Sequence, residues 1–257
     1  MSRKDIQLEI RGAVALVRLA RPAKRNALSD GLILAVREVF ENLPDTVRAA
    51  VLDGQGEHFC AGLDLSELQE RDAGQGLHHS RMWHAALECV QYGPVPVIAA
   101  LHGAVVGGGL ELACACHIRV ADETAFYALP EDSRGIFVGG GGAVRIPRLI
   151  GAARMADMMF TGRVYNAQDG ERIGMSQYLV AAGKASEKAF ELAERVAQNA
   201  PLTNFALMHA LPRIAEQPAD QGFLTEALMA AIAQSAPEAK LRVRDFLEGR
   251  ANKVRKA

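Results

Sequence analysis

The chain has 257 residues, a formal net charge of -1, 49% hydrophobic residues and 23% charged residues. This is the composition of a globular protein with one large domain, or one domain with a helical extension. The near-zero net charge excludes an electrostatic basis for binding nucleic acid or an anionic membrane. The basic cluster Lys253, Arg255 and Lys256 is expected to be a solvated terminus.

Up to Gly151 the sequence predicts strands that alternate with helices, which favours parallel pairing with crossovers. The first elements are a hairpin of strands 6–10 and 14–19, and a helix that Ser29 caps and that carries apolar residues from 32 to 43. Those that follow are a strand at 47–52, a strand end with a turn at 59–65, a polar and mobile segment at 72–77, a helix at 82–90, and strands at 95–101 and 117–121.

Beyond Gly151 the sequence is almost wholly helical. Helical spacing of apolar residues predicts helices at 152–160, 167–174, 187–199, 202–216, 221–234 and 237–248. We therefore expect a core at 1–195 and a C-terminal helical region at 196–257. The apolar stretches 205–211 and 223–232 exceed what a thin helical region can bury, which predicts self-association.

The sequence also bears on the location of the protein. Cys60, Cys89, Cys114 and Cys116 show no disulfide or zinc spacing, so reduced core thiols are expected. No apolar run reaches the roughly 20 residues of a transmembrane helix, and residues 1–10 lack the apolar core of a signal peptide. We expect a cytoplasmic protein without membrane or nucleic-acid partners.

The stretch from His102 to Ala113 is the first candidate for a functional site. Three glycines, 107–109, follow the predicted strand at 95–101. Glycine lets the backbone approach a ligand closely, and a helix that begins there directs unpaired N–H groups outward, as an oxyanion requires. Glu111 lies at this helix start among apolar residues, where a carboxylate is expected to be neutralised, paired or used in chemistry.

Glu131 lies twenty residues after Glu111 and is the second candidate. A helix, a strand and a turn between them are enough to bring both carboxylates together. Two carboxylates around one water can divide the roles of acid and base. A solvated turn after Pro130 is the alternative for Glu131. The glycine run 139–142 lacks the other residues of a phosphate loop, so a tight turn or helix packing is favoured there.

Several ordered motifs resemble the crotonase family, that is, the enoyl-CoA hydratases and isomerases. They are Arg-Pro-Ala-Lys-Arg-Asn-Ala-Leu-Ser at 21–29, Phe-Cys-Ala-Gly-Leu-Asp-Leu at 59–65, the stretch from Pro96 through the glycine run to Glu111, and Pro130-Glu131. The resemblance covers nearly the whole chain. It implies an α/β fold, a spiral of ββα repeats that holds an acyl-CoA site, with a helical C-terminal region that mediates trimerisation. It also implies a homotrimer or a dimer of trimers (a hexamer).

The resemblance implies specific residue roles as well. The backbone N–H groups of Leu63 and Gly108 form an oxyanion hole for the thioester carbonyl, and Glu111 and Glu131 are catalytic. Glu111 activates a water for attack at C3 and Glu131 delivers a proton to C2, although the two roles can be exchanged. The residues implied in binding coenzyme A are Ala23, Lys24, Arg25, Ala61, Asp64 and Leu65.

The expected function is that of a hydro-lyase of fatty acid metabolism. It hydrates a 2-enoyl-CoA reversibly to a 3-hydroxyacyl-CoA, the coenzyme A thioester is the substrate, and neither a metal nor a redox cofactor is needed. The alternatives are an isomerase or a thioester hydrolase on the same fold, and a non-catalytic acyl-CoA-binding protein. A Ser80–His84 triad, or one with Cys89, is disfavoured because that segment supplies no oxyanion hole.

Some positions depart from the family pattern. The stretch 137–141 has no acid, which argues against the dehalogenating and dienoyl-isomerising branches, and Val138 replaces a common proline. Gly249 stands where some relatives have a phosphate-contacting lysine. That contact is therefore expected to be missing, or to come from Arg250 or Lys253.

Overall fold

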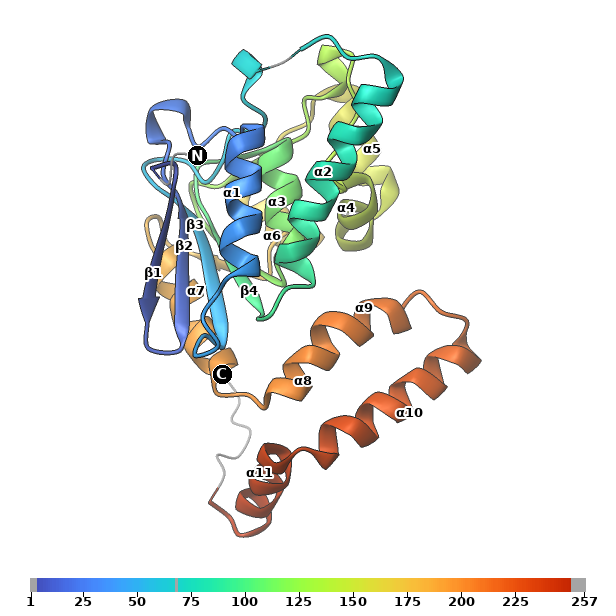
Figure 1. Ribbon diagram of the computed structural model, residues 1–257. Coiled ribbons are helices and arrows are strands. Elements are labelled where there is room, and N and C mark those ends of the chain that lie inside the picture. Colours follow the sequence, from blue (N-terminus) through green and yellow to red (C-terminus); the bar gives the residue numbers. More distant parts are fainter. Residues whose placement is uncertain (1–3, 68, 251–257) are drawn as a thin grey trace. The chain divides into compact units, whose positions relative to one another are not determined.

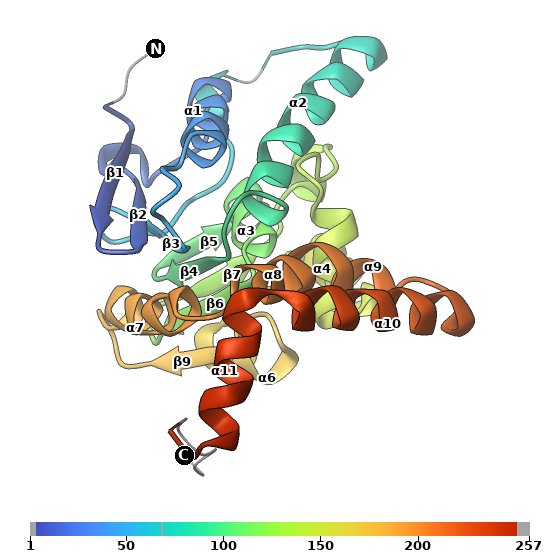
Figure 2. The same ribbon diagram turned by 60° about the horizontal axis from the view of Figure 1, so that its bottom comes forward.

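The computed structural model describes residues 4–67 and 69–250 of the chain, and the fold divides after Ala197 into two units (Figures 1 and 2). The strands of the first unit are β1 (Ile6–Arg11), β2 (Val14–Leu19), β3 (Ala49–Gly54), β4 (Val97–Leu101), β5 (Ala104–Val106), β6 (Ile118–Asp122), β7 (Phe126–Ala128), β8 (Tyr165–Asn166) and β9 (Tyr178–Val180). Its α-helices are α1 (Asp30–Glu41), α2 (Ala73–Gln91), α3 (Gly108–Ala115), α4 (Gly142–Ile150), α5 (Ala152–Thr161), α6 (Ala167–Ile173) and α7 (Ala185–Ala197).

The strands form two sheets. The large sheet has the order β1-β2-β3-β4-β6-β9, and it is parallel except for the antiparallel pair β1–β2. The small sheet has the order β5-β7-β8, with β5 and β7 parallel. Parallel neighbours require crossover connections, and the helices supply them.

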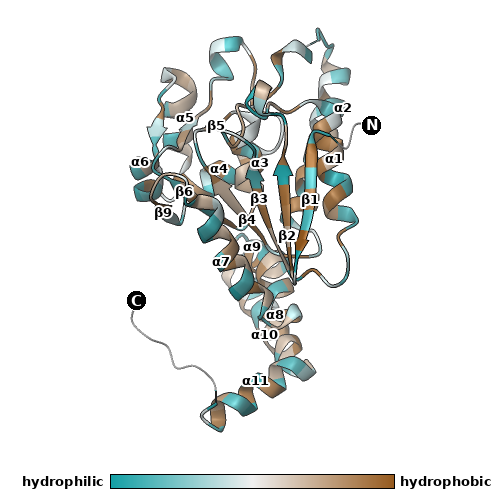
Figure 3. Ribbon diagram, turned by 90° about the vertical axis from the view of Figure 1, so that its left-hand side faces the viewer, coloured by the Kyte–Doolittle hydropathy of each residue, from teal (hydrophilic) through white to brown (hydrophobic). Residues whose placement is uncertain are grey.

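Side chains that alternate along the strands give the large sheet two apolar faces. Val17 and Leu52 belong to one core, which includes the inward faces of α1 and α2. Their chain neighbours Leu16 and Val51 belong to a second core with α7. Figure 3 shows the central strands as mostly hydrophobic, which is the pattern of a sheet covered on both faces.

Successive turns of the chain repeat one pattern. Each adds a strand to the large sheet, a strand to the small sheet and then a helix, as in β4–β5–α3 and β6–β7–α4. An earlier turn contributes only a single bridge to the small sheet, where Cys60 pairs with Val105. This arrangement confirms the predicted α/β spiral of ββα repeats.

Two local predictions differ from the structure. At 59–65 the predicted turn is present at Gly62, with φ 95°, but isolated bridges flank it in place of a strand end. Residues 72–77, predicted to be a mobile segment, are the N-cap and first residues of α2. Asp72 accepts the Gln75 N–H at 2.8 Å and the Gln75 side chain accepts the Asp72 N–H at 3.1 Å. This capping box offsets the low helix propensity of the glycines that follow it.

Other local predictions are confirmed. The hairpin lies where the sequence placed it, and the Ser29 hydroxyl accepts the Leu32 N–H at 3.1 Å and caps α1. The expected helices beyond Gly151 are present within one to a few residues of their predicted ends. The sequence analysis missed α4 and the strands β5, β7, β8 and β9. These strands have two or three residues each, too few for an alternating pattern to be recognised.

The second unit is helical. It contains α8 (Pro201–Phe205), a π-helical turn (Ala206–Ala210), α9 (Leu211–Ile214), α10 (Ala219–Ser235) and α11 (Pro237–Leu247). Phe223, Leu224 and Leu228 of α10 are 71%, 64% and 56% exposed, so this helix leaves large apolar side chains uncovered. The basic cluster at Lys253, Arg255 and Lys256 lies outside the described residues.

Within the described residues, no helix is both long enough and apolar enough to cross a membrane. The four cysteines are free thiols, of which Cys60, Cys114 and Cys116 are buried and Cys89 is partly buried. Burial raises the pKa of the Cys60 and Cys116 thiols to about 12, so both are held as neutral core side chains.

Candidate active site

Glu111 lies in the first turn of α3 and is 3% exposed. Its Oε1 accepts the N–H of Gly140 at 2.8 Å and the N–H of Gly142 at 2.7 Å. A Cβ at Gly142 would lie 2.8 Å from that same oxygen, so only glycine lets the loop approach so closely. The run 139–142 is therefore a tight turn at the start of α4, and it holds the Glu111 carboxylate.

The Glu111 carboxylate is subject to opposing influences. Burial is the largest of them and raises its pKa above the usual value, while the two backbone N–H donors and the guanidinium of Arg145 act in the opposite direction and limit this rise. Arg145 is 8% exposed and fixes the same loop, because its Nη1 donates to Gly140 O at 3.0 Å and its Nε to the Gln91 side chain at 2.7 Å. The sequence analysis missed this support, which joins α2, α4 and the loop before α4.

Glu131 follows β7 and is 7% exposed, so the alternative of a solvated turn residue is wrong. Its Oε1 lies so close to Gly107 that a Cβ there would be 2.6 Å away, and Gly107 has a φ of 52°. Its Oε2 is buried, with no hydrogen-bond partner among the described residues. Burial raises the pKa of Glu131 to about 7, and the neighbouring Glu111 charge acts in the same direction. Glu131 is thus poised to hold or release a proton near neutral pH.

In the part of the chain that the structure describes, two backbone N–H groups beside these carboxyls have no backbone acceptor. Gly108 is the first residue of α3, where an N–H has no partner within the helix. Leu63 follows the Gly62 turn, and among the described residues its N–H donates to no backbone acceptor, whereas the next residue's N–H donates to Leu28 O at 2.8 Å. Both residues are therefore able to donate to a ligand oxygen.

One cavity of about 250 Å³ brings these groups together. Its lining includes Leu63, Gly108, Glu111 and Glu131. The remaining lining residues are Arg71, Gly76, His79, Ser80, Trp83, Ile136, Phe137, Val138, Gly139 and Gly140. Two carboxyls and two unpaired N–H donors thus face the same space, the combination that acid–base chemistry next to a polarised carbonyl requires.

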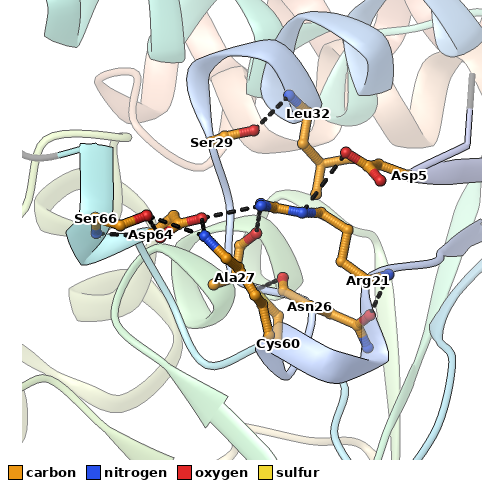
Figure 4. A network of polar contacts seen from close by, with 10 residues as sticks. Asp5, Arg21, Asn26, Ala27, Ser29, Leu32, Cys60, Asp64 and Ser66 are labelled. Carbon is orange, nitrogen blue, oxygen red and sulfur yellow. Dashed lines mark hydrogen bonds and ion pairs between the residues drawn. The ribbon is translucent and has the colours of Figure 1, made fainter. Parts of the chain in front are cut away.

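The segments expected to bind coenzyme A also meet. The Asp64 carboxylate accepts from Lys24 Nζ at 2.8 Å, from Arg21 at 3.0 Å and from the Ser66 hydroxyl at 2.6 Å (Figure 4). The ammonium of Lys24 is the main cause that holds the pKa of Asp64 well below its usual range. The Ala61 N–H donates to Arg25 O at 3.0 Å. These contacts join the loops at 21–27 and 60–66, and Leu63 belongs to the second of them.

Individual residues of these loops differ in exposure. The exposed residues are Ala23, Lys24, Arg25 and Leu65, although the Lys24 ammonium is already bonded to Asp64 and to the Ser66 hydroxyl. Asp64 is buried and has a structural role, because its carboxylate is occupied by three partners. Of the replacements considered for the missing C-terminal lysine, Arg250 forms ion pairs with Asp245 and Glu248, and Lys253 lies outside the described residues.

Asp30 and His79 form a pair that the sequence analysis missed. The Asp30 carboxylate contacts His79 Nε2 at 2.7 Å and accepts from Trp83 Nε1 at 3.0 Å. Burial alone would raise the pKa of Asp30, but the hydrogen bonds from Trp83 and His79 outweigh it and lower the pKa. The residues that contact one another are 49 and 53 positions apart, and no local pattern signals them. Among the described residues, no hydrogen bond joins Ser80 or Cys89 to a histidine.

A larger cavity of about 710 Å³ lies at the ends of the large sheet's strands, and its lining contains neither Glu111 nor Glu131. The two buried aspartates of this lining are occupied. Asp53 pairs with Arg18 at 2.7 Å, and Asp122 accepts from Thr124 and from the Gly183 N–H. In the described residues no group of three or more His, Cys, Asp or Glu side chains is arranged to hold a metal ion. The glutamate cavity is therefore the candidate active site.

Comparisons with known proteins identify the family of the chain. A family model described as enoyl-CoA hydratase/isomerase matches residues 9–255. Enoyl-CoA hydratase EchA19 of Mycobacterium tuberculosis is 30% identical over 96% of this chain and 95% of its own length. Carnitinyl-CoA dehydratase of Proteus mirabilis is 34% identical over 86% of this chain and 85% of its own length. The crystal structure of a "putative enoyl-CoA hydratase" from Rhodopseudomonas palustris superposes with a TM-score of 0.94 at 60% identity, covering 96% of both chains.

Proposed function

The chain belongs to the enoyl-CoA hydratase/isomerase family, and we propose that it adds water reversibly to a 2-enoyl-CoA to form a 3-hydroxyacyl-CoA. The observation that carries this proposal is the single cavity lined by two buried carboxyls and by two residues with unpaired backbone N–H groups. Hydration needs one group to take a proton from water and another to give a proton to carbon. An isomerase or a thioester hydrolase on the same fold is the alternative.

The proposed mechanism begins at the thioester carbonyl. The N–H groups of Leu63 and Gly108 donate to its oxygen and stabilise the negative charge that develops there in the transition state. Glu111, whose anion is favoured by two backbone donors, takes a proton from the water as its oxygen bonds to C3. The electrons of the double bond move toward the carbonyl oxygen.

Glu131 completes the addition. Its pKa of about 7 keeps much of it protonated near neutral pH, so it gives its proton to C2 as the enolate collapses. The cycle closes when a proton returns from Glu111 to Glu131 through water. Both proton transfers use carboxyl groups and no electrons are exchanged, so we propose that the reaction needs neither a metal nor a redox cofactor.

The size of the cavity supports a short acyl group. Its volume of about 250 Å³ is below the roughly 300–1,000 Å³ of typical small-molecule sites. We propose that coenzyme A itself lies along the joined loops at 21–27 and 60–66, where Lys24 and Arg25 are exposed. The compartment proposed remains the cytoplasm, on the sequence grounds given above.

We also propose that the protein is a homotrimer or a dimer of trimers. The support is the exposed apolar surface of α10, where Phe223, Leu224 and Leu228 are more than half exposed. Light scattering at micromolar concentration tests this directly. A mass of three or six chains is expected, and a monomer would contradict the proposal.

The assay that tests the reaction is spectroscopic. The purified full chain is mixed with 2-enoyl-CoA thioesters of graded chain length, and absorbance of the conjugated enoyl thioester is followed. We expect this absorbance to fall most rapidly for short chains. If the absorbance persists with every substrate, the protein neither hydrates the double bond nor moves it out of conjugation with the thioester, and the proposal is contradicted.

A further inference from the structure

One wall of the active-site cavity is polar, and the proposed mechanism does not use it. Arg71, His79 and Ser80 line the cavity on the side formed by α2 and the loop before it. The lining also contains the apolar residues Trp83, Ile136, Phe137 and Val138. A plain alkyl chain would match only these apolar residues.

The contacts of the polar wall leave polar atoms unused. His79 Nε2 donates to the Asp30 carboxylate at 2.7 Å, and its Nδ1, which is an acceptor in the neutral ring, has no hydrogen-bond partner in the described part of the chain. The Arg71 guanidinium is 3.8 Å from the Asp30 carboxylate, which is an ion pair but too long for a hydrogen bond. Asp30 therefore holds both side chains in place and leaves N–H groups of Arg71 free to bind a ligand.

The polar side chains of this wall are partly buried. Those of Arg71 and His79 are 24% and 21% exposed. An acyl chain that fills the cavity would remove more of the remaining water. Polar groups that lose water without gaining a partner cost free energy, so an alkyl chain is penalised here and an oxygen acceptor is not. A site built to hydrogen-bond a substrate discriminates against the analogue that lacks the bonding group.

We propose that the preferred acyl group carries an oxygen at its far end, in a carboxylate or a hydroxyl, to which Arg71 donates; a hydroxyl can in addition donate to His79 Nδ1. This inference rests on the proposed function for the position of the acyl chain. The planar guanidinium of Arg71 suits a carboxylate in particular, because it can donate two parallel hydrogen bonds. Asp30 positions His79 and carries the balancing negative charge.

A binding experiment tests the inference without requiring turnover. Three saturated acyl-CoA thioesters of equal chain length, ending in a methyl, a hydroxyl or a carboxylate group, are titrated into the full-length protein by calorimetry. We expect the best oxygen-bearing ligand to bind about 10- to 100-fold more tightly than the methyl ligand, the range of one charge-assisted hydrogen bond. The hydroxyl and carboxylate arms distinguish a neutral from an anionic acceptor.

Matched variants localise the effect. Arg71→Met should bring the affinity ratio of either oxygen-bearing ligand to the methyl ligand toward one, and His79→Leu should lower this ratio for the hydroxyl ligand. Arg81→Met and His78→Leu are the controls, because both residues are exposed on α2 and neither lines the cavity. They should leave the ratio unchanged.

The outcomes separate the two proposals. Equal affinity for the three ligands, or a preference that survives in both Arg71→Met and His79→Leu, would overturn the inference. A preference that depends on these residues in a protein that hydrates no enoyl-CoA would leave the inference standing and overturn the hydratase proposal instead.

Discussion

The Gly142 N–H donates to Glu111 Oε1 at 2.7 Å, and this contact joins two segments 31 residues apart. It explains why a glycine run without the features of a phosphate loop lies beside the active site. The run supplies backbone donors to a buried carboxylate, and side chains there would displace that carboxylate. Glu131 has no comparable donors at its Oε2, so the two carboxyls are chemically unequal.

Because the two carboxyls are unequal and have different proposed roles, neither can replace the other, and we predict that both glutamates are essential. Glu111→Gln and Glu131→Gln each keep the side-chain shape but cannot transfer the proton, so we expect hydration to fall about 10²- to 10⁴-fold. Binding of a saturated acyl-CoA should change little, because the lost interaction matters mainly in the transition state. Steady-state rates and calorimetric affinities measure the two effects. A rate within a few-fold of wild type in either variant would contradict the assigned role.

A substitution in the glycine run should displace the Glu111 carboxylate while leaving the glutamate itself unchanged. In Gly142→Ala the new Cβ would lie 2.8 Å from Glu111 Oε1 and 2.9 Å from its Cγ, so the carboxylate must move. We expect kcat to fall at least about tenfold, because small displacements of catalytic groups are costly. Gly31→Ala in α1 is the control, since its Cβ would meet nothing closer than 3.8 Å. Similar kcat values for both variants would count against the positioning role of the loop.

Two substitutions at Gly108 separate the effect of the N–H from that of added bulk. Gly108→Pro and Gly108→Ala both place a Cβ near Trp83, at 3.1 Å from its ring, but only proline removes the N–H donor. Proline is tolerated at the first position of a helix, so the fold should survive. We expect the proline variant to be about 10² to 10³ slower than the alanine variant. Equal rates would show that this N–H does not bind the carbonyl.

The buried Glu131 carboxyl should make folding stability depend on pH. Its pKa is raised from 4.5 to about 7, so the folded protein holds a proton that the unfolded chain has released within this range. The stabilisation is complete below the unfolded value and is lost as the pH rises through about 7.

Glu131→Gln carries no charge at any pH and should escape this loss. Above pH 7 we expect it to be more stable than wild type, by on the order of 3 kcal/mol, with little difference at acidic pH. Denaturant unfolding at several pH values measures this, with the exposed Glu123→Gln as the control. A parallel pH dependence in wild type and Glu131→Gln would refute the raised pKa.

Local signals in the sequence predicted much of the fold. The hairpin signal of β1 and β2, the Ser29 cap and the helical spacing of α1 each lie within a few residues, and each predicted its element. The glycines before Glu111 likewise indicated a helix start at the candidate site. The spacing of Glu131 from Glu111 made Glu131 a candidate, and the motif at 59–65 added Leu63 through family resemblance.

Contacts between distant segments could not be predicted in this way. The hydrogen bonds from Gly140 and Gly142 to Glu111, and the Asp30–His79 pair, depend on how the spiral stacks its turns. The beginning of α2 was misinterpreted for a different reason. Its glycines suggested a mobile segment, but the reciprocal hydrogen bonds between Asp72 and Gln75 offset the low helix propensity of those glycines.

Product analysis in ¹⁸O-labelled water tests the central claim most directly. Wild-type protein is incubated with a short 2-enoyl-CoA, and the product is examined by mass spectrometry. The proposed mechanism predicts a gain of one water, with the heavy oxygen on the C3 hydroxyl and the thioester intact. A product of unchanged mass would indicate isomerisation, heavy oxygen in a released carboxylate would indicate thioester hydrolysis, and either result would contradict hydration as the function of this site.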